Sequence, residues 1–186
     1  MTEESNGLLL AFDQATVTGW AVVNLKGKYV TSGVIDTRGS IANRGESAAA
    51  RYMRFRAEFC SLVDKYNPVY VIHEQTIPPM GGKKTSWATA DFAVGLKVIM
   101  QVECHSRDVP ILNVMPGTLK KFATGNGRAQ KTEMVDACNK WLSEKENYAD
   151  NCECKKKPIS VKDDNEADAI HIARFIAETY TKKYNQ

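Results

Sequence analysis

The feature that most constrains the fold is an apolar run, residues 8–12, that ends in the single carboxylate of Asp13 before a second apolar run begins. Burial of an unpaired carboxylate costs several kcal/mol, so Asp13 needs a partner, a bound cation or contact with solvent. A second run, residues 69–73, ends in the same way at Glu74. Short apolar runs bounded by turn residues are typical of buried strands. The sequence therefore predicts two core strands that each end in an acid.

Hydrophobic periodicity predicts further elements around these two strands. Strands are expected at residues 7–12, 19–25 and 29–35, with the short turns of an antiparallel meander, and again at 69–74 and 111–114. Helices are expected at 46–66, 86–106, from residue 116 to about 124, 130–142 and 163–184. This order predicts an α/β fold with a central mixed sheet of five strands, three antiparallel and then parallel. On such sheets, ligands collect at strand ends.

Size and composition limit the class of protein. The 186 residues, of which 43% are hydrophobic and 25% charged, suit a single globular domain over residues 1–186, with a polar loop or insertion at about 143–163. The apolar runs are too short to span a bilayer, and the N-terminal residues are acidic and polar, unlike a signal peptide. We expect an intracellular protein that does not bind membranes. Its five cysteines, an odd number without a known zinc-motif spacing, are interpreted as free thiols.

The last predicted helix carries two further acids. Asp164 and Asp168 are four residues apart, so they share one helical face, and the alanines around them leave that face slim enough to approach the sheet. If the strands that end at Asp13 and Glu74 are neighbours, their carboxylates repel unless a cation lies between them. Carboxylate oxygens are the ligands that Mg²⁺ and Mn²⁺ prefer. Two such ions, about 3.5–4 Å apart, support attack of water on a phosphodiester.

Four motifs in this order, "FDQATVTGWAVV", "VYVIHEQTI", "TGNGRAQKTEMV" and "DDNEADAIHIA", resemble those of the RuvC family of Holliday junction resolvases, in the RNase H-like superfamily. The resemblance covers nearly the whole chain. It implies an RNase H-like fold and a metal-dependent endonuclease that cuts four-way DNA junctions symmetrically, leaving a 5′-phosphate and a 3′-hydroxyl. It also implies Mg²⁺ as cofactor, with Mn²⁺ as a substitute and two ions per site. A homodimer is expected, with the helix at 86–106 as its interface.

The resemblance also implies roles for individual residues. Asp13, Glu74 and Asp168 correspond to catalytic, metal-binding acids of the family. The family has its other acid three residues before the last one, where this chain has Asn165; Asp164, one residue earlier, or Asn165 itself is the fourth site residue. The glycine-rich loop followed by Lys131 implies that this lysine reaches the scissile phosphate or the attacking water. "DQAT" replaces the Pro-Gly that tends to follow the first acid in bacterial members.

Candidate DNA-binding residues lie in the loop at 75–87 and at scattered basic positions. The loop combines apolar residues that could wedge at a branch point with lysines that could bind phosphates. The residue that the family places at the junction crossover is Ile77 here. The full set is Ile77, Lys83, Lys84, Trp87, Arg44, Lys120, Lys121 and Arg128.

Some residues also have simpler structural interpretations, and the chain has alternative functions. Asp163 is favoured as a helix N-cap, and His73 and His171 as ordinary core or surface residues. An RNase H acting on RNA–DNA hybrids would use the same acids. A junction-binding protein with weak or no catalysis is the other alternative, because Asn165 stands where the family has an acid. The compact domain and atypical spacing suit a phage-type member acting in a host cytoplasm.

Overall fold

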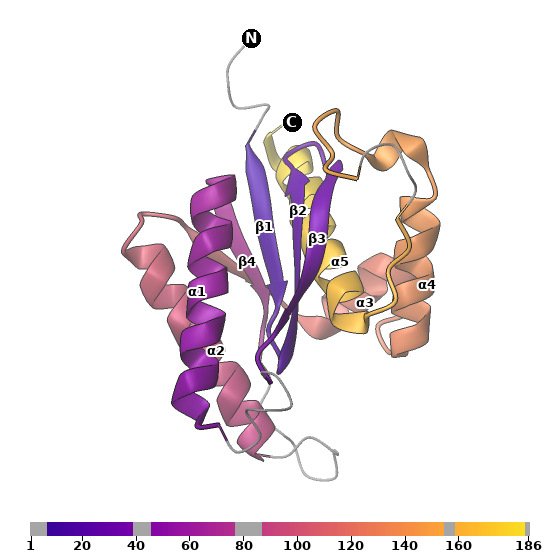
Figure 1. Ribbon diagram of the computed structural model, residues 1–186. Coiled ribbons are helices and arrows are strands. Elements are labelled where there is room, and N and C mark those ends of the chain that lie inside the picture. Colours follow the sequence, from indigo (N-terminus) through magenta and orange to yellow (C-terminus); the bar gives the residue numbers. More distant parts are fainter. Residues whose placement is uncertain (1–6, 39–45, 77–86, 155–158, 185–186) are drawn as a thin grey trace.

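A computed structural model describes residues 7–38, 46–76, 87–154 and 159–184, apart from the side chains of residues 87 and 180–184 (Figure 1). Predicted residues that fall outside this part of the chain include Arg44, Ile77, Lys83 and Lys84. Every helix in the described part is too short or too polar to cross a membrane.

The core is one sheet of five strands in the order β3-β2-β1-β4-β5. The strands β1, β2 and β3 form an antiparallel meander, whereas β4 and β5 add in parallel beside β1. The predicted mixed sheet is therefore confirmed. The strands are β1 (Leu8–Asp13), β2 (Val17–Asn24), β3 (Tyr29–Asp36), β4 (Tyr70–Glu74) and β5 (Ile111–Val114).

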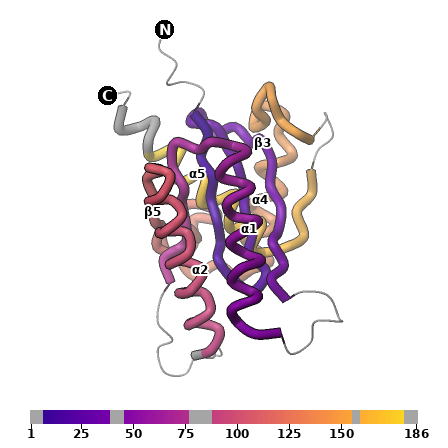
Figure 2. Tube along the Cα trace, turned by 60° about the vertical axis from the view of Figure 1, so that its left-hand side comes forward, coloured from indigo at the N-terminus to yellow at the C-terminus, as the bar shows by residue number. Residues whose placement is uncertain are grey.

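Helices cover both faces of the sheet, and their predicted positions are confirmed within a few residues. Helices α1 and α2 pack side by side on one face (Figure 2). The other face is covered by α5, which crosses β1 and β2, and by α3 and α4 packed against it (Figure 1). The helices are α1 (Ala48–Tyr66), α2 (Trp87–His105), α3 (Pro116–Thr124), α4 (Lys131–Leu142), the short 3₁₀ helix η3 (Lys145–Asn147) and α5 (Asp164–Tyr184).

Burial on both faces explains the continuous apolar runs of β1 and β4. Alternate residues of a strand point to opposite faces. In β1, Leu10 and Phe12 pack in the cluster under α1 and α2, whereas Leu9 and Ala11 pack in the cluster under α3 and α5. In β4, the same alternation assigns Ile72 to the α5 side. Asp13 and Glu74 therefore extend the rows that face α5.

Part of the polar segment after α4 is held against the edge strand β3. The Ala149 amide donates to the Tyr29 carbonyl at 2.8 Å, and the Glu153 amide donates to the Val30 carbonyl at 3.0 Å. Because these bonds use backbone groups of the sheet edge, the segment covers an edge that would otherwise be open to another strand.

The same segment corrects one prediction. Cys152 and Cys154 form a disulfide, with 5.4 Å between their Cα atoms, so the expectation of free thiols is wrong for this pair. The turn around these residues brings together two side chains that an extended chain would separate. The remaining three cysteines are free, as predicted: Cys60, Cys104 and Cys138.

Candidate active site

The ends of β1 and β4 bring the first two acids to one edge of the sheet. The two strands are parallel neighbours, and their last register pair joins Phe12 to His73. Asp13 and Glu74 each follow directly in the chain, at the carboxyl ends of their strands. On its other side, Glu74 is paired with Val114 of β5.

The start of α5 reaches this edge because of a glycine. Gly19 of β2 is the register partner of Asp13. An ideal Cβ placed on Gly19 would lie 1.9 Å from the Asn165 carbonyl oxygen, which is far inside van der Waals contact. Only glycine lets the helix backbone approach so closely. The rest of α5 also packs closely, because three of its buried residues have the short side chain of alanine. These are Ala167, Ala169 and Ala173.

The polar residues at the start of α5 have different roles. The Asp163 carboxylate accepts hydrogen bonds from the amides of Asn165 and Glu166 at 3.0 and 3.1 Å, which confirms it as an N-cap. The Asn165 side chain donates to the Val17 carbonyl of β2 at 2.8 Å. Asn165 therefore ties the helix to the sheet, whereas Asp164 lies among the charges of the site.

The negative charges of the four acids act on one another. Burial raises the pKa of Asp13 well above its ordinary value, and the negative charges of Glu74 and Asp168 raise it further. Asp164 adds to the same effect. Burial and then Asp168 raise the pKa of Glu74 to about 7. Burial and then Asp164 raise the pKa of Asp168 to about 6. Burial is the first cause of all three raised pKa values, and the negative charge of the neighbouring acids comes second.

Two lysines partly offset this charge. Lys131, the first residue of α4, forms an ion pair with Asp164, and that hydrogen bond raises the pKa of the lysine. Its side chain is 77% exposed, so the ammonium also faces solvent. Lys120 of α3 donates to the Ala129 carbonyl at 2.8 Å, and its charge lowers the pKa of both Glu74 and Asp168.

The acids have the chemistry of a divalent cation site. Their oxygens are hard ligands, and their mutual repulsion is what a bound cation removes. Asp168 Oδ1 is buried and accepts no hydrogen bond from the described residues. Within those residues, no three His, Cys, Asp or Glu side chains are placed so that they could hold a metal ion as they lie. The donor set fits an ion in type and charge, whereas the described side chains as they lie do not form a complete metal site.

Of the predicted DNA-binding residues that the structure describes, Lys120 lies close enough to the site to lower the pKa of Glu74 and Asp168. Lys121 on α3 is exposed, as is Arg128 in the loop between α3 and α4. Gly125 ends α3 in the left-handed conformation, with φ of 79°, which turns the chain toward α4. For Trp87 the structure describes only its place at the start of α2.

Sequence reasoning missed Gln14, whereas the interpretation of His171 as an ordinary core or surface residue is confirmed. Gln14 directly follows Asp13, and its side chain donates to the Glu74 carbonyl. The signal that could have found Gln14 is its place in "DQAT", where the motif departs from Pro-Gly. His171 is fully buried, with Nε2 3.1 Å from the Met134 carbonyl and Nδ1 3.0 Å from an Arg174 guanidinium nitrogen. It is a core residue that joins α4 to α5.

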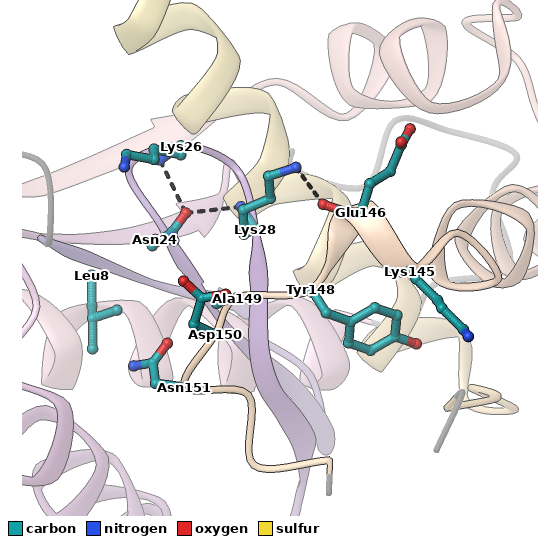
Figure 3. A pocket seen from close by; sticks show the side chains of 10 residues that line it. All are labelled: Leu8, Asn24, Lys26, Lys28, Lys145, Glu146, Tyr148, Ala149, Asp150 and Asn151. Atoms are coloured by element: carbon teal, nitrogen blue, oxygen red, sulfur yellow. Dashed lines mark hydrogen bonds between the residues drawn. The ribbon is translucent and has the colours of Figure 1, made fainter. Parts of the chain in front are cut away.

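A hollow of about 700 Å³ lies at the opposite end of the sheet, near the first residue of β1 (Figure 3). Lysines and acids line it together, among them Lys26, Lys28, Glu146 and Asp150. The Lys28 ammonium is already bonded to the Glu146 carbonyl. Because its charges are mixed and the four acids are at the other end of β1, this hollow is not the candidate active site.

Comparisons with known proteins agree with the motifs. No family model matches the chain. The crossover junction endodeoxyribonuclease RuvC of Neorickettsia sennetsu is 28% identical over 121 residues, which cover 63% of this chain and 67% of that protein. Thermus thermophilus RuvC, solved in complex with a Holliday junction substrate, has a TM-score of 0.69 and 19% identity, with 96% of both chains covered. The yeast mitochondrial Holliday junction resolvase Ydc2 has a TM-score of 0.63 and 16% identity, with 96% of this chain and 82% of that chain covered. The chain is therefore RuvC-like in sequence and has the RNase H-like fold of the RuvC structures.

Proposed function

We propose that this chain is a metal-dependent endodeoxyribonuclease that resolves four-way DNA junctions by phosphodiester hydrolysis, leaving a 5′-phosphate and a 3′-hydroxyl. The observation that carries the proposal is the meeting of four carboxylates from β1, β4 and α5 at one sheet edge, with raised pKa values for three of them. The RuvC-like sequence and fold support the choice of a branched DNA substrate.

Asp13, Glu74, Asp164 and Asp168 would hold two Mg²⁺ ions, and Mn²⁺ would substitute. When bound, the ions supply an activated water and stabilise charge on the leaving oxygen. The carboxylates would keep the ions at the sheet edge, and because the pKa values of Asp13, Glu74 and Asp168 are raised, ion binding would compete with protons. Lys131, which is paired with Asp164 and largely exposed, would orient the scissile phosphate or the attacking water. Lys121 and Arg128 supply further phosphate contacts.

Cleavage of a labelled four-way junction in Mg²⁺ or Mn²⁺ tests this function. Linear duplex and RNA–DNA hybrid are run beside it, with Asp13→Asn and Asp168→Asn as inactive variants and Asp136→Asn, an exposed residue of α4, as the matched control. We expect paired symmetric nicks in the junction from the native chain and the control alone. Cutting of the hybrid instead would favour an RNase H. Tight junction binding without cutting would favour the weakly catalytic alternative.

We also propose that the chain acts as a homodimer through α2. Three valines spaced four residues apart, Val94, Val98 and Val102, are 45%, 49% and 59% exposed. Side chains at this spacing lie on one side of a helix, so they form an apolar stripe along α2. A second copy of the chain that packs its own α2 against this stripe would bury it and provide two active sites for two strands.

Sedimentation velocity at micromolar concentrations tests the dimer. Val98→Glu places a charge in the middle of the stripe and is expected to yield monomers. Val34→Glu, at a valine of β3 that is also 45% exposed, is the matched control and should leave the dimer intact. A native chain that sediments as a monomer would refute the proposal, as would an unaffected Val98→Glu variant.

The extent of the nuclease domain is a further part of the proposal. The described strands all belong to one sheet, which supports a single domain over residues 1–186 with the segment at 143–163 as a surface insertion. A phage source stays a prediction.

A further inference from the structure

Gln14 joins the ends of the two strands that carry the first two acids. Its Nε2 donates to the Glu74 carbonyl at 2.5 Å and to the Thr76 hydroxyl at 3.1 Å. The residue is only 7% exposed, so these bonds are made away from bulk water. The side chain immediately after Asp13 therefore binds the backbone of Glu74 and the residue two positions beyond it.

This connection lies where backbone pairing between the strands ends. The last register pair of β1 with β4 is Phe12 with His73, so Asp13 and Glu74 are one residue past it. The Glu74 carbonyl also lies 2.7 Å from His73 Nδ1, which fixes the peptide group from a second direction. The amide of Gln75 donates to Val114 of β5 at 2.9 Å, on the side away from β1.

The acceptor of the same side chain is unused. Gln14 Oε1 is buried and accepts no hydrogen bond from the residues that the structure describes. A buried acceptor without a donor costs free energy, so a water at the site would gain by donating to it. Gln14 thus combines a donor that ties two strand ends with a buried acceptor that has no donor among the described residues.

We propose that Gln14 is a positioning residue, which sets the separation of Asp13 and Glu74 and thereby the affinity of the site for a divalent cation. The inference rests on the proposed metal-dependent function and names a residue that acts through the acids. When both are charged, Asp13 and Glu74 repel each other, which favours movement of the two strand ends away from each other. The Gln14 bond opposes that movement, so the carboxylates are held ready for the ion.

The experiment compares Mn²⁺ binding by the native chain, Gln14→Met and Thr76→Val. Methionine keeps the length of glutamine but can neither donate nor accept as an amide does, whereas Thr76→Val removes only the second acceptor. Bound Mn²⁺ is measured by electron paramagnetic resonance, and thermal unfolding in EDTA verifies that each variant folds. Junction binding in EDTA and the cleavage rate at saturating Mn²⁺ are measured beside it.

We expect Gln14→Met to weaken Mn²⁺ binding about 10-fold to 100-fold, as loss of partners that orient metal ligands does. Thr76→Val should have a smaller effect in the same direction. Junction binding in EDTA should be unchanged, because Gln14 acts on the ion site and not on DNA contacts. If Gln14→Met does not fold, Thr76→Val carries the same comparison alone.

Equal Mn²⁺ binding by the native chain and the variants, at any level, would overturn the inference. Failure of the proposed function has a different signature, since the native chain would then bind Mn²⁺ more tightly than Gln14→Met but cut no junction. The two hypotheses are therefore separated by one set of proteins.

Discussion

Replacement of Asp168 by asparagine should make the protein more stable in the absence of metal. The carboxyl has a pKa of about 6 in the folded chain, compared with 3.8 ordinarily, because burial and the nearby Asp164 disfavour its charge. This difference corresponds to about 3 kcal/mol at pH 7.5, since one pKa unit is worth about 1.4 kcal/mol. Partial exposure to solvent screens the charge, so we expect a gain of about 1–3 kcal/mol.

The sign of the pH dependence follows from the raised pKa. Above about pH 6 the native chain carries the unfavourable charge, so Asp168→Asn has its full advantage there. As the pH falls through about 6 toward 3.8, the native carboxyl takes up a proton and the advantage disappears. The free energy of unfolding is measured with urea in EDTA at pH 7.5, 6.0 and 5.0, which we chose to bracket the folded pKa of about 6.

Two controls make this measurement decisive. Asp136→Asn, on the exposed side of α4, changes charge equally and should alter stability little. At saturating Mn²⁺ the native chain should have a higher free energy of unfolding than Asp168→Asn, because an ion that binds only the folded native site stabilises that chain. An Asp168→Asn variant that is no more stable than the native chain at pH 7.5, or whose advantage does not change with pH, would refute the reasoning.

Three further predictions concern the scaffold. Gly19→Ala should cost about 3 kcal/mol or more and abolish cleavage, because its Cβ would meet the Asn165 carbonyl; Gly117→Ala, which meets nothing within 4 Å, is the control in thermal unfolding. Glu103→Gln should cost about 1–3 kcal/mol in urea at pH 7, because its carboxylate bonds two arginines. Those bonds lower its pKa to about 2, so its contribution is present above about pH 4.5 and is lost as the pH falls through about 2. Burial lowers the pKa of His171 to about 4, so its NMR signals should show a neutral ring down to that pH; a midpoint near 6.5 would contradict its burial.

Most elements of the fold could be predicted because their signals are local. The apolar runs that end at Asp13 and Glu74 predict strands, and the polar and proline-containing turns beside them predict where those strands stop. Apolar residues spaced three and four positions apart predict the helices in the same way. Because each signal lies within a few residues, burial and backbone preference were readable without knowledge of the rest of the chain.

The candidate site was predictable in part. The acids on strand ends and on the last helix were identified from their positions, and in the structure the charges of Glu74, Asp168 and Asp164 all act on Asp13. The choice between Asp164 and Asn165 needed the fold, because only the packing of α5 on β2 shows that Asn165 binds the Val17 carbonyl. The roles of these residues in catalysis stay predictions.

By itself, the sequence determined the order of strands and helices and the two strands that end in an acid, since hydrophobic periodicity and turn residues act over short distances. Only the tertiary structure decided which groups meet across the chain. It brings Gln14 to the Glu74 carbonyl, lets α5 lie on Gly19, and joins the Glu153 amide to the Val30 carbonyl at the edge of β3. Hydrogen bonds and close approaches of this kind depend on the relative placement of distant elements to a few tenths of an ångström, and no local pattern of residues carries that information.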